Sequence, residues 1–169
     1  FLHRGFEKSC ENSTWTQVFP YTDRLNYVSS IMNNVGYALA VEKLCRLDVP
    51  ERAKYLRVIS SELHRICDHL TLVGATGLEL GAMTIVIFAV EARDLVWDRL
   101  TELCGARLTS NYARIGGVTR DMPEGWAEKT LKTLTLEEKV AQMIGVRAFG
   151  IYTNPASPEY KTLIEAVET

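Results

Sequence analysis

The sequence lacks any C-x-x-C pair, although it contains four cysteines. Cys10, Cys45, Cys67 and Cys104 are widely separated, which argues against a zinc ribbon and against an iron–sulfur site built by this chain alone. We therefore expect no metal bound by the chain itself. Three of the four cysteines lie on apolar or helical stretches, so we expect buried, reduced thiols, as in a reducing compartment.

Long hydrophobic runs and an excess of charge are also absent. The longest apolar run, residues 82–90, has about half the length that crossing a bilayer requires, and we interpret it as part of a buried helix. The first residues lack a charged segment followed by an apolar one, so we expect no signal peptide. With 19 basic and 21 acidic side chains, the formal net charge is −2, which gives no electrostatic reason to expect nucleic acid as a partner.

The hydrophobic residues that are present, 47% of 169, are sufficient for the core of one domain, and their spacing predicts helices. One helix is expected from an N-cap at Thr22–Asp23 to about residue 46. A second begins at Pro50 and repeats apolar residues nearly every seven positions to Val73. A third spans 83–104, ending at Gly105, and a fourth opens at 122–124.

The first predicted helix carries polar groups among its apolar ones. Tyr27, Asn34 and Tyr37 recur at roughly helical spacing. Such groups either satisfy one another inside a helical bundle or line a binding site, and the spacing alone leaves both interpretations open.

The second predicted helix has a charged face. Its members are Arg52, Arg57, Glu62, Arg65 and Asp68. We expect this face to be solvated or to lie between subunits. His64 and His69 are five residues apart and point to different faces, which argues against a metal site on this helix.

Glu79 is the carboxylate that stands out in the chain. It lies between two leucines in a segment that Gly74, Gly77 and Gly81 are expected to loosen. Burying a carboxylate there is costly unless it is paired or protonated, so Glu79 is a candidate functional residue. The alternative is an ordinary acid at a helix end.

Several motifs together resemble one family. They are LHRGFEK (2–8), PYTDRLNYVSS (20–30), YALAVEKL (37–44), VPERAKYLRVISSELHRICDHL (49–70), LELGAMT (78–84) and GARLTSNYARIGGVTRDMP (105–123). In this order they resemble the 49 kDa (D) subunit of NADH–quinone oxidoreductase, respiratory complex I, which is related to the large subunit of nickel–iron hydrogenases. The resemblance covers residues 1–133 and implies a mainly α fold, a helical bundle of that type, truncated, with an irregular C-terminal tail.

The resemblance implies a role at a quinone site. By this resemblance, the matching tyrosine, Tyr27, is expected to donate a hydrogen bond to the headgroup of ubiquinone or menaquinone. Arg24 is expected to approach the terminal iron–sulfur cluster, which a partner subunit would hold. Glu79 matches an acid that pairs with a second quinone ligand, a histidine located upstream of this chain. Such a fragment binds neither NADH nor flavin, and we expect it to be inactive in isolation.

Partners and location follow from the same resemblance. The expected partners are other peripheral-arm subunits, above all the iron–sulfur subunit beside the quinone, with the membrane arm reached indirectly. The expected location is peripheral, at the cytoplasmic face of the inner (plasma) membrane, without a transmembrane segment.

Four positions depart from the family pattern or from its hydrogenase relatives. The acid is usually aspartate, whereas Glu79 is longer by one methylene. Thr109 stands where the family often has a histidine near the cluster, which favours a low-potential quinone such as menaquinone. The hydrogenases have a C-x-x-C pair at the level of Asn26 and Ser29, so hydrogenase activity is not expected here.

The tail, residues 134–169, resembles instead the opening of family 3 glycoside hydrolases. It contains none of the catalytic carboxylates of that family, and we interpret Glu137, Glu138 and Glu159 as acids in first turns of helices. We expect a fusion or an artefact at this junction. A glycosidase fragment and a non-catalytic helical bundle remain the alternative interpretations of the chain.

Overall fold

The computed structural model describes residues 5–133, and the statements below concern that range. The predicted tail, residues 134–169, lies outside the described residues, as do Glu137, Glu138 and Glu159 and the first three residues of the LHRGFEK motif. Residues 5–130 belong to one compact unit.

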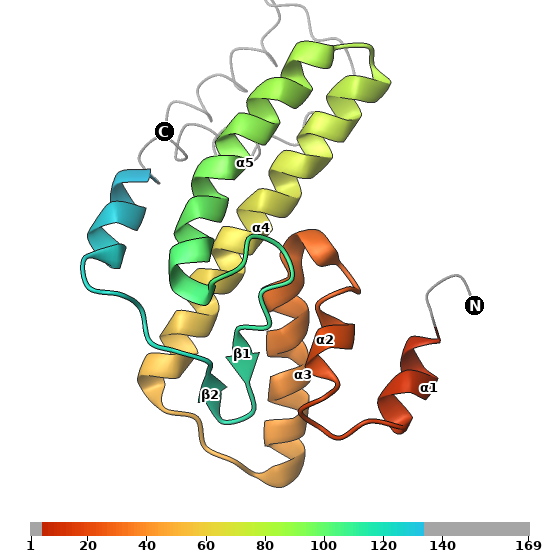
Figure 1. Ribbon diagram of the computed structural model, residues 1–169, viewed down its shortest axis with the longest axis vertical. Coiled ribbons are helices and arrows are strands. Elements are labelled where there is room, and N and C mark those ends of the chain that lie inside the picture. Colours follow the sequence, from red (N-terminus) through yellow and green to blue (C-terminus); the bar gives the residue numbers. More distant parts are fainter. Residues whose placement is uncertain (1–4, 134–169) are drawn as a thin grey trace, which may run out of the picture. The chain divides into compact units, whose positions relative to one another are not determined.

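The described part of the chain is mainly α-helical, as predicted (Figure 1). In chain order the elements are α1 (Phe6–Glu11), α2 (Phe19–Thr22), a 3-10 turn η1 (Tyr27–Ser29), α3 (Ser30–Cys45), α4 (Glu51–Glu79), α5 (Met83–Cys104), β1 (Ala113–Arg114) and β2 (Gly117–Val118). The two short strands pair antiparallel. A further helical segment begins at residue 126.

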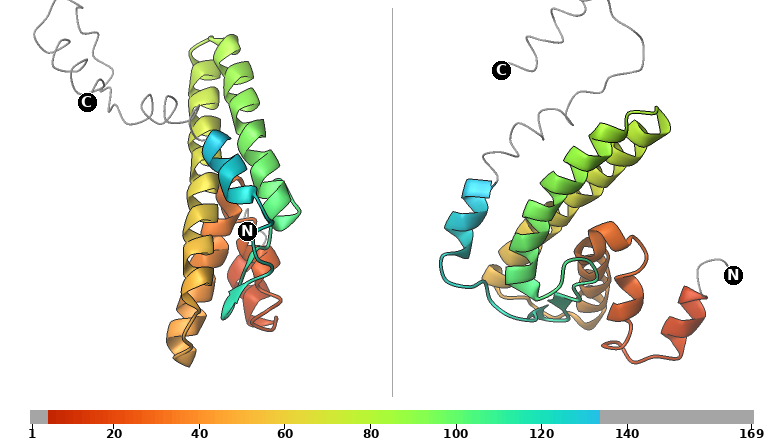
Figure 2. Two further views of the ribbon diagram at one scale, coloured as in Figure 1. Left: turned by 90° about the vertical axis from the view of Figure 1, so that its left-hand side faces the viewer. Right: turned by 45° about the horizontal axis from the view of Figure 1, so that its top comes forward.

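Helices α4 and α5 form a long antiparallel hairpin (Figures 1 and 2). The predicted bounds of α5 are confirmed, and Gly105 ends it with a φ of 86°. Of the three glycines expected to loosen the preceding segment, Gly74 and Gly77 instead lie inside α4, and Gly81 follows its end with a φ of 81°. A Cβ added at Gly77 would lie 2.9 Å from the Cβ of Ile85, and one at Gly74 would lie 3.2 Å from the Cβ of Ala89. These glycines therefore allow the two helices to pack closely.

The seven-residue seam predicted for α4 is correct at every second position. The buried leucines are Leu56, Leu63 and Leu70. The positions predicted between them are exposed or half-buried, and small residues are buried instead: Ser60, Cys67 and Gly74. Because closely packed helices leave little room between their backbones, small side chains occupy this part of the interface.

The prediction of one helix from residue 23 to residue 46 is wrong at its start. Helix α3 begins at Ser30, and the preceding residues form α2, a turn and η1. Thr22 and Asp23 do not form the N-cap of α3. Their side chains are buried and form hydrogen bonds with Asn34 of α3, so the chain turns before α3 begins.

The charged face predicted for α4 is confirmed at Arg52, Glu62 and Arg65, which are exposed, but the prediction is wrong for Arg57. Arg57 is 3% exposed and forms a bidentate ion pair with Glu42 of α3, with nitrogen–oxygen distances of 2.9 and 2.5 Å. A buried guanidinium requires such a partner.

This buried ion pair also holds the β-hairpin. Arg57 donates to the backbone carbonyls of Arg114 and Gly117, and the backbone N–H of Gly116 donates to Glu42 at 2.7 Å. These hydrogen bonds hold the pKa of the Glu42 carboxyl below its usual range, the Arg57 guanidinium being the largest cause. The ion pair therefore joins α3, α4 and the hairpin into one body.

The apolar run 82–90 is not buried as a whole, contrary to our prediction. Met83, Ile87 and Phe88 are each at least 60% exposed, and Ala89 is the buried residue of the run. Within the described part of the chain, α4 is the main helix packed against α5, and much of this run remains exposed. None of the helices among residues 5–133 combines the length and the hydrophobicity needed to span a membrane.

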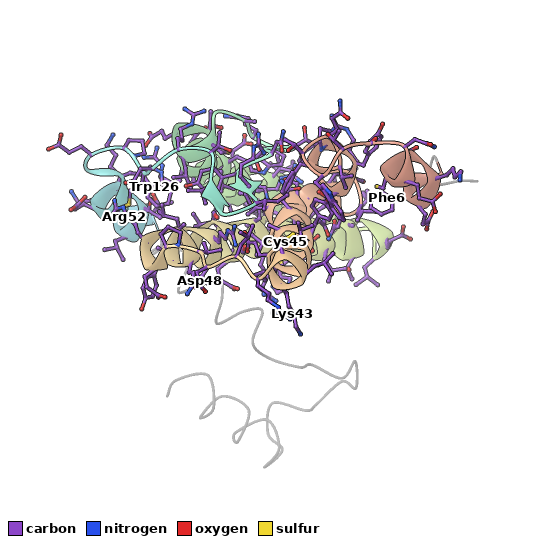
Figure 3. All side chains as sticks on the ribbon, turned by 90° about the horizontal axis from the view of Figure 1, so that it is seen from below. Phe6, Lys43, Cys45, Asp48, Arg52 and Trp126 are labelled. Atoms are coloured by element: carbon purple, nitrogen blue, oxygen red, sulfur yellow. The ribbon has the colours of Figure 1, made fainter. Side chains whose placement is uncertain are left out.

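The four cysteines are thiols that form no disulfide within residues 5–133. Cys67 and Cys104 are buried as expected, and burial raises the pKa of the Cys104 thiol. Cys10 is half-buried, and Cys45 is exposed, which contradicts our expectation for that residue. Figure 3 labels Cys45 near the end of α3, where the chain passes on to α4.

Candidate functional site

Residues 23–30 lead from α2 into α3 and include η1, and they carry Arg24 and Tyr27. We call this segment the Tyr27 turn. Tyr27 is 59% exposed and Leu25 is 54% exposed. Asn26 between them is extended, with φ −120° and ψ 93°, so these residues leave the helical path. The Tyr27 side chain has no hydrogen-bond partner among residues 5–133, and its hydroxyl is available to an external acceptor.

A buried carboxylate anchors the start of this turn. Asp23 is 1% exposed, and its Oδ1 accepts a hydrogen bond from Asn34 Nδ2 at 2.7 Å and another from the backbone N–H of Asn111 at 3.3 Å. Thr22 in turn donates to Asn34 Oδ1 at 2.7 Å. Burial raises the pKa of the Asp23 carboxyl, and its hydrogen bonds and nearby arginines partly oppose that effect.

Buried groups from two other segments anchor the end of the turn. The Ser30 hydroxyl donates to the backbone carbonyl of Leu108 at 2.6 Å. The backbone N–H of Ile31 donates to Nδ1 of His64, on α4, at 3.2 Å. Because a backbone N–H only donates, Nδ1 of His64 carries the lone pair, and the imidazole is neutral with its proton on Nε2.

A third contact holds the middle of the turn. Asn26 Nδ2 donates to Asp68 of α4 at 3.1 Å, and the carbonyl of Asn26 accepts from Asn33 Nδ2 at 3.0 Å. The residues around Tyr27 are therefore held from α3, from α4 and from the loop after α5, while the Tyr27 ring itself stays exposed.

The loop after α5 lies along this turn. Its contacts at Leu108 and Asn111 bracket Thr109, the position where the family resemblance places a residue near a cluster. The tertiary structure thus brings Tyr27 and the Thr109 loop together, although about eighty residues separate them in the sequence.

Arg24 lies at the edge of an open groove of about 600 Å³. Its Nη1 donates to the carbonyl of Pro20 at 2.7 Å, which uses one of the five N–H donors of the guanidinium. The other residues that line the groove are Asn12, Ser13, Gln17, Pro20 and Tyr21. Arg24 therefore presents a positive charge on an open surface.

Glu79 does not join this cluster. It is exposed as the last residue of α4, the position that the alternative interpretation, an acid at a helix end, predicts. Asp68, which contacts the turn, precedes it by eleven residues, or roughly 16 Å of helix. Among the described residues Glu79 has no ion pair, and its role stays a prediction.

The polar residues of the first predicted helix have different roles. Asn34 is fully buried between Thr22 and Asp23, and the Tyr37 hydroxyl donates to the carbonyl of Trp15 at 2.9 Å. Both are satisfied structural groups. Tyr27 lies outside α3 and has no such partner in the described chain, so of these three residues it is the one available to a ligand.

Sequence reasoning missed the groups that support this turn. We interpreted Asp23 as part of an N-cap, considered His64 only as a metal ligand, and placed Arg57 on a solvated or inter-subunit face. Nothing in their sequence spacing indicates the long-range partners Asn111, Ile31 and Glu42. The one available signal was the polarity of Asn34 within an apolar stripe.

The acceptor role of His64 predicts a pH dependence of stability. Burial lowers the pKa of His64 to about 4 from an ordinary value of 6.5. Between these two pH values the unfolded chain binds a proton at His64 and the folded chain does not. Stability therefore falls as the pH drops from about 6.5 to about 4, by roughly 3 kcal/mol in all. Denaturant unfolding of the 169-residue chain over this pH range, compared with His64→Asn, measures the effect.

A matched control for that series is Ser60→Ala, which removes a buried hydroxyl from the same helix but no titratable group. It should shift the unfolding midpoint equally at every pH. If wild type and His64→Asn lost stability in parallel between pH 6.5 and 4, the neutral, buried state of His64 would be disproved.

The described residues, 5–133, contain no group of three or more His, Cys, Asp or Glu side chains placed to hold a metal ion. The site consists instead of a phenol, an arginine and the buried groups that fix the turn between them.

The sequence matches a known family model over residues 79–146. The family is described as the 49 kDa subunit of respiratory-chain NADH dehydrogenase. The match continues beyond the boundary near residue 133 that we expected for the resemblance. The likeness of residues 134–169 to glycoside hydrolases finds no support in these matches.

The chain is also similar to whole proteins over most of its length. It is 76% identical over 148 residues to the D 1 subunit of the NADH-quinone oxidoreductase of Anaeromyxobacter dehalogenans, which covers 85% of this chain and 34% of that protein. It is 81% identical over 134 residues to the D 2 subunit of Anaeromyxobacter sp. strain Fw109-5, covering 79% and 31%. For the D subunit of Myxococcus xanthus the identity is 63% over 134 residues, covering 79% and 32%. The chain spans about a third of the length of these relatives.

Proposed function

We propose that this chain, which is similar to D (49 kDa) subunits of NADH–quinone oxidoreductases, forms part of the quinone headgroup site of such an enzyme. In this role Tyr27 donates a hydrogen bond to a carbonyl oxygen of the quinone. The reaction reduces the quinone with two electrons that originate from NADH and two protons, yielding the quinol.

The observation that supports this proposal best is the Tyr27 turn itself. Its backbone is fastened by Asp23, Asn26 and Ser30, yet the Tyr27 side chain is 59% exposed. A phenol remains protonated at neutral pH and can donate to a carbonyl. A donor held on a fixed backbone is preorganised for its acceptor, which lowers the cost of binding.

Arg24 suits a place beside an electron donor held by a partner subunit. The cysteines of this chain are dispersed, with Cys67 and Cys104 buried, so they do not offer a cluster site among the described residues. We therefore assign the iron–sulfur cluster to the neighbouring subunit. A fixed positive charge such as that of Arg24 near a cluster favours the reduced form of the cluster.

We assign Glu79 to the proton-coupled side of the site, where it pairs with a histidine from another part of the subunit. Its exposure at the end of α4 leaves it accessible for such a partner. Thr109, half-buried in the loop beside the turn, provides no protonatable group there. Among ubiquinone and menaquinone, this favours the lower-potential menaquinone.

The exposed apolar side chains of the α4–α5 hairpin support the proposal that this chain contacts other subunits. Leu80, Ile87 and Phe88 are 82, 60 and 64% exposed, and exposed apolar surface of this kind suits an interaction site. We propose contacts with other peripheral-arm subunits, and with the membrane arm only indirectly. The complex would lie at the cytoplasmic face of the membrane, and NADH and flavin would bind to other subunits.

Photoaffinity labelling of the intact oxidoreductase tests this proposal. A quinone analogue with a photoreactive headgroup should label peptides that contain residues 24–30 or 108–111, and excess quinone should suppress the labelling. Labelling confined to other peptides, with the analogue still competing for turnover, would contradict a headgroup site at Tyr27 and favour a purely structural role for this bundle.

A further inference from the structure

Helix α3 begins without a local cap. The first N–H groups of any helix have no acceptor inside the helix, and a side chain just before the helix usually supplies one. The N-cap residue of α3 is Ser29, and its side chain makes no capping hydrogen bond. This uncapped end directly follows η1, whose first residue is Tyr27.

His64 supplies the missing acceptor from another helix. Its Nδ1 accepts the backbone N–H of Ile31, the second residue of α3, at 3.2 Å, and the imidazole is fully buried. Ser30 Oγ lies 3.5 Å from the same nitrogen but donates its proton to the carbonyl of Leu108. Nε2 of His64 has no partner in the described part of the chain, so the polar contacts described for the ring are all at Nδ1.

We infer that His64 is a positioning residue for the quinone site, because it caps α3 from α4 and thereby fixes the η1 turn that carries Tyr27. This inference rests on the proposed function of Tyr27. His64 itself touches no substrate. Its cap ties the tyrosine-bearing turn to the long helix α4, as Asn26 does through Asp68.

The chemistry of the ring suggests a specific set of variants. His64→Asn places an amide oxygen near the position of Nδ1 and retains an acceptor for Ile31. His64→Leu has a similar shape but no acceptor. His64→Gln stays polar, but its oxygen extends toward the position of Nε2, away from Ile31. The hydrogen bond from the backbone N–H of Ile31 is therefore expected to be kept in His64→Asn and lost in His64→Leu and His64→Gln.

Two measurements read out the two parts of the inference. Amide hydrogen exchange of the 169-residue chain reports the cap directly: exchange at residues 30–33 should accelerate at least tenfold in His64→Leu and His64→Gln and stay within threefold of wild type in His64→Asn. In the intact oxidoreductase, KM for a short-chain quinone should rise about tenfold in the Leu and Gln variants, with the Asn variant within twofold of wild type. Electron transfer from NADH to ferricyanide should be unchanged.

The outcomes separate the cap from the proposed function. Unchanged exchange in both Leu and Gln would overturn the inference. Accelerated exchange with unchanged quinone KM would overturn the positioning role, provided that Tyr27→Phe impairs quinone reduction. If Tyr27→Phe has no effect, the proposed function fails and the positioning role fails with it. Should the Leu variant not assemble, the contrast between Gln and Asn gives the same decision.

Discussion

Replacing Tyr27 by phenylalanine is expected to lower kcat/KM for quinone reduction about 100-fold in the intact oxidoreductase. The variant keeps the ring and removes only the hydroxyl, which is exposed and has no partner in residues 5–133. A donor aimed at an oxygen that gains negative charge during reduction typically contributes this much to a rate. Steady-state turnover with a short-chain quinone, measured against NADH–ferricyanide activity in the same preparation, isolates the quinone step.

Tyr55→Phe is the matched control for this substitution. Tyr55 lies on α4 and is 68% exposed, so its variant removes an equally accessible hydroxyl from outside the turn. We expect its turnover to stay within twofold of wild type. Equal turnover in Tyr27→Phe and wild type would remove Tyr27 from the quinone site and favour a structural role for the bundle.

Replacing Arg57 by methionine is expected to destabilise the 169-residue chain by about 3–5 kcal/mol. The substitution leaves the carboxylate of Glu42, 4% exposed, buried without its cation. It also removes the donors to the carbonyls of Arg114 and Gly117. The Arg57 guanidinium is also the largest cause of the lowered pKa of the Glu42 carboxyl, so the ionised acid depends on the same contact. The shift of the denaturant midpoint at constant slope measures the loss.

Two further variants show whether burial causes this effect. Arg65→Met breaks an ion pair with Glu62 in which both side chains are about half exposed, and it should cost less than about 1 kcal/mol. The double variant Glu42→Gln, Arg57→Met removes the stranded charge and should recover part of the stability. If Arg57→Met were no more destabilising than Arg65→Met, the buried pair would have no special role.

The best sequence predictions rest on short-range signals. The bounds of α5 were correct because an apolar segment changes to an amphipathic one and then meets Gly105, whose positive φ ends the helix. The seam of α4 was correct at its leucines, since a period of seven identifies one helical face.

The errors occur where partners are distant in the sequence. Arg57 shares a helix with exposed charges, and only the position of Glu42 on α3 decides that it is buried. Asp23 precedes an apolar stripe as an N-cap would, but Asn34 and Asn111 bind its carboxylate and the helix starts later. The apolar half of α5 was expected to be buried, and among residues 5–133 much of it remains exposed although α4 packs against α5.

By itself, the sequence determined the helical class, the extent of α5 and the identity of Tyr27, Arg24 and Glu79 as candidate residues. Periodicity, glycine stops and family motifs are properties of neighbouring residues, and a single chain displays them directly. The tertiary structure alone decided that Tyr27 lies on a turn outside α3, that Asp23 and His64 hold this turn, and that Glu79 lies apart from it. These arrangements depend on hydrogen bonds between residues eleven to eighty-eight positions apart, whose geometry exists only after the helices have packed.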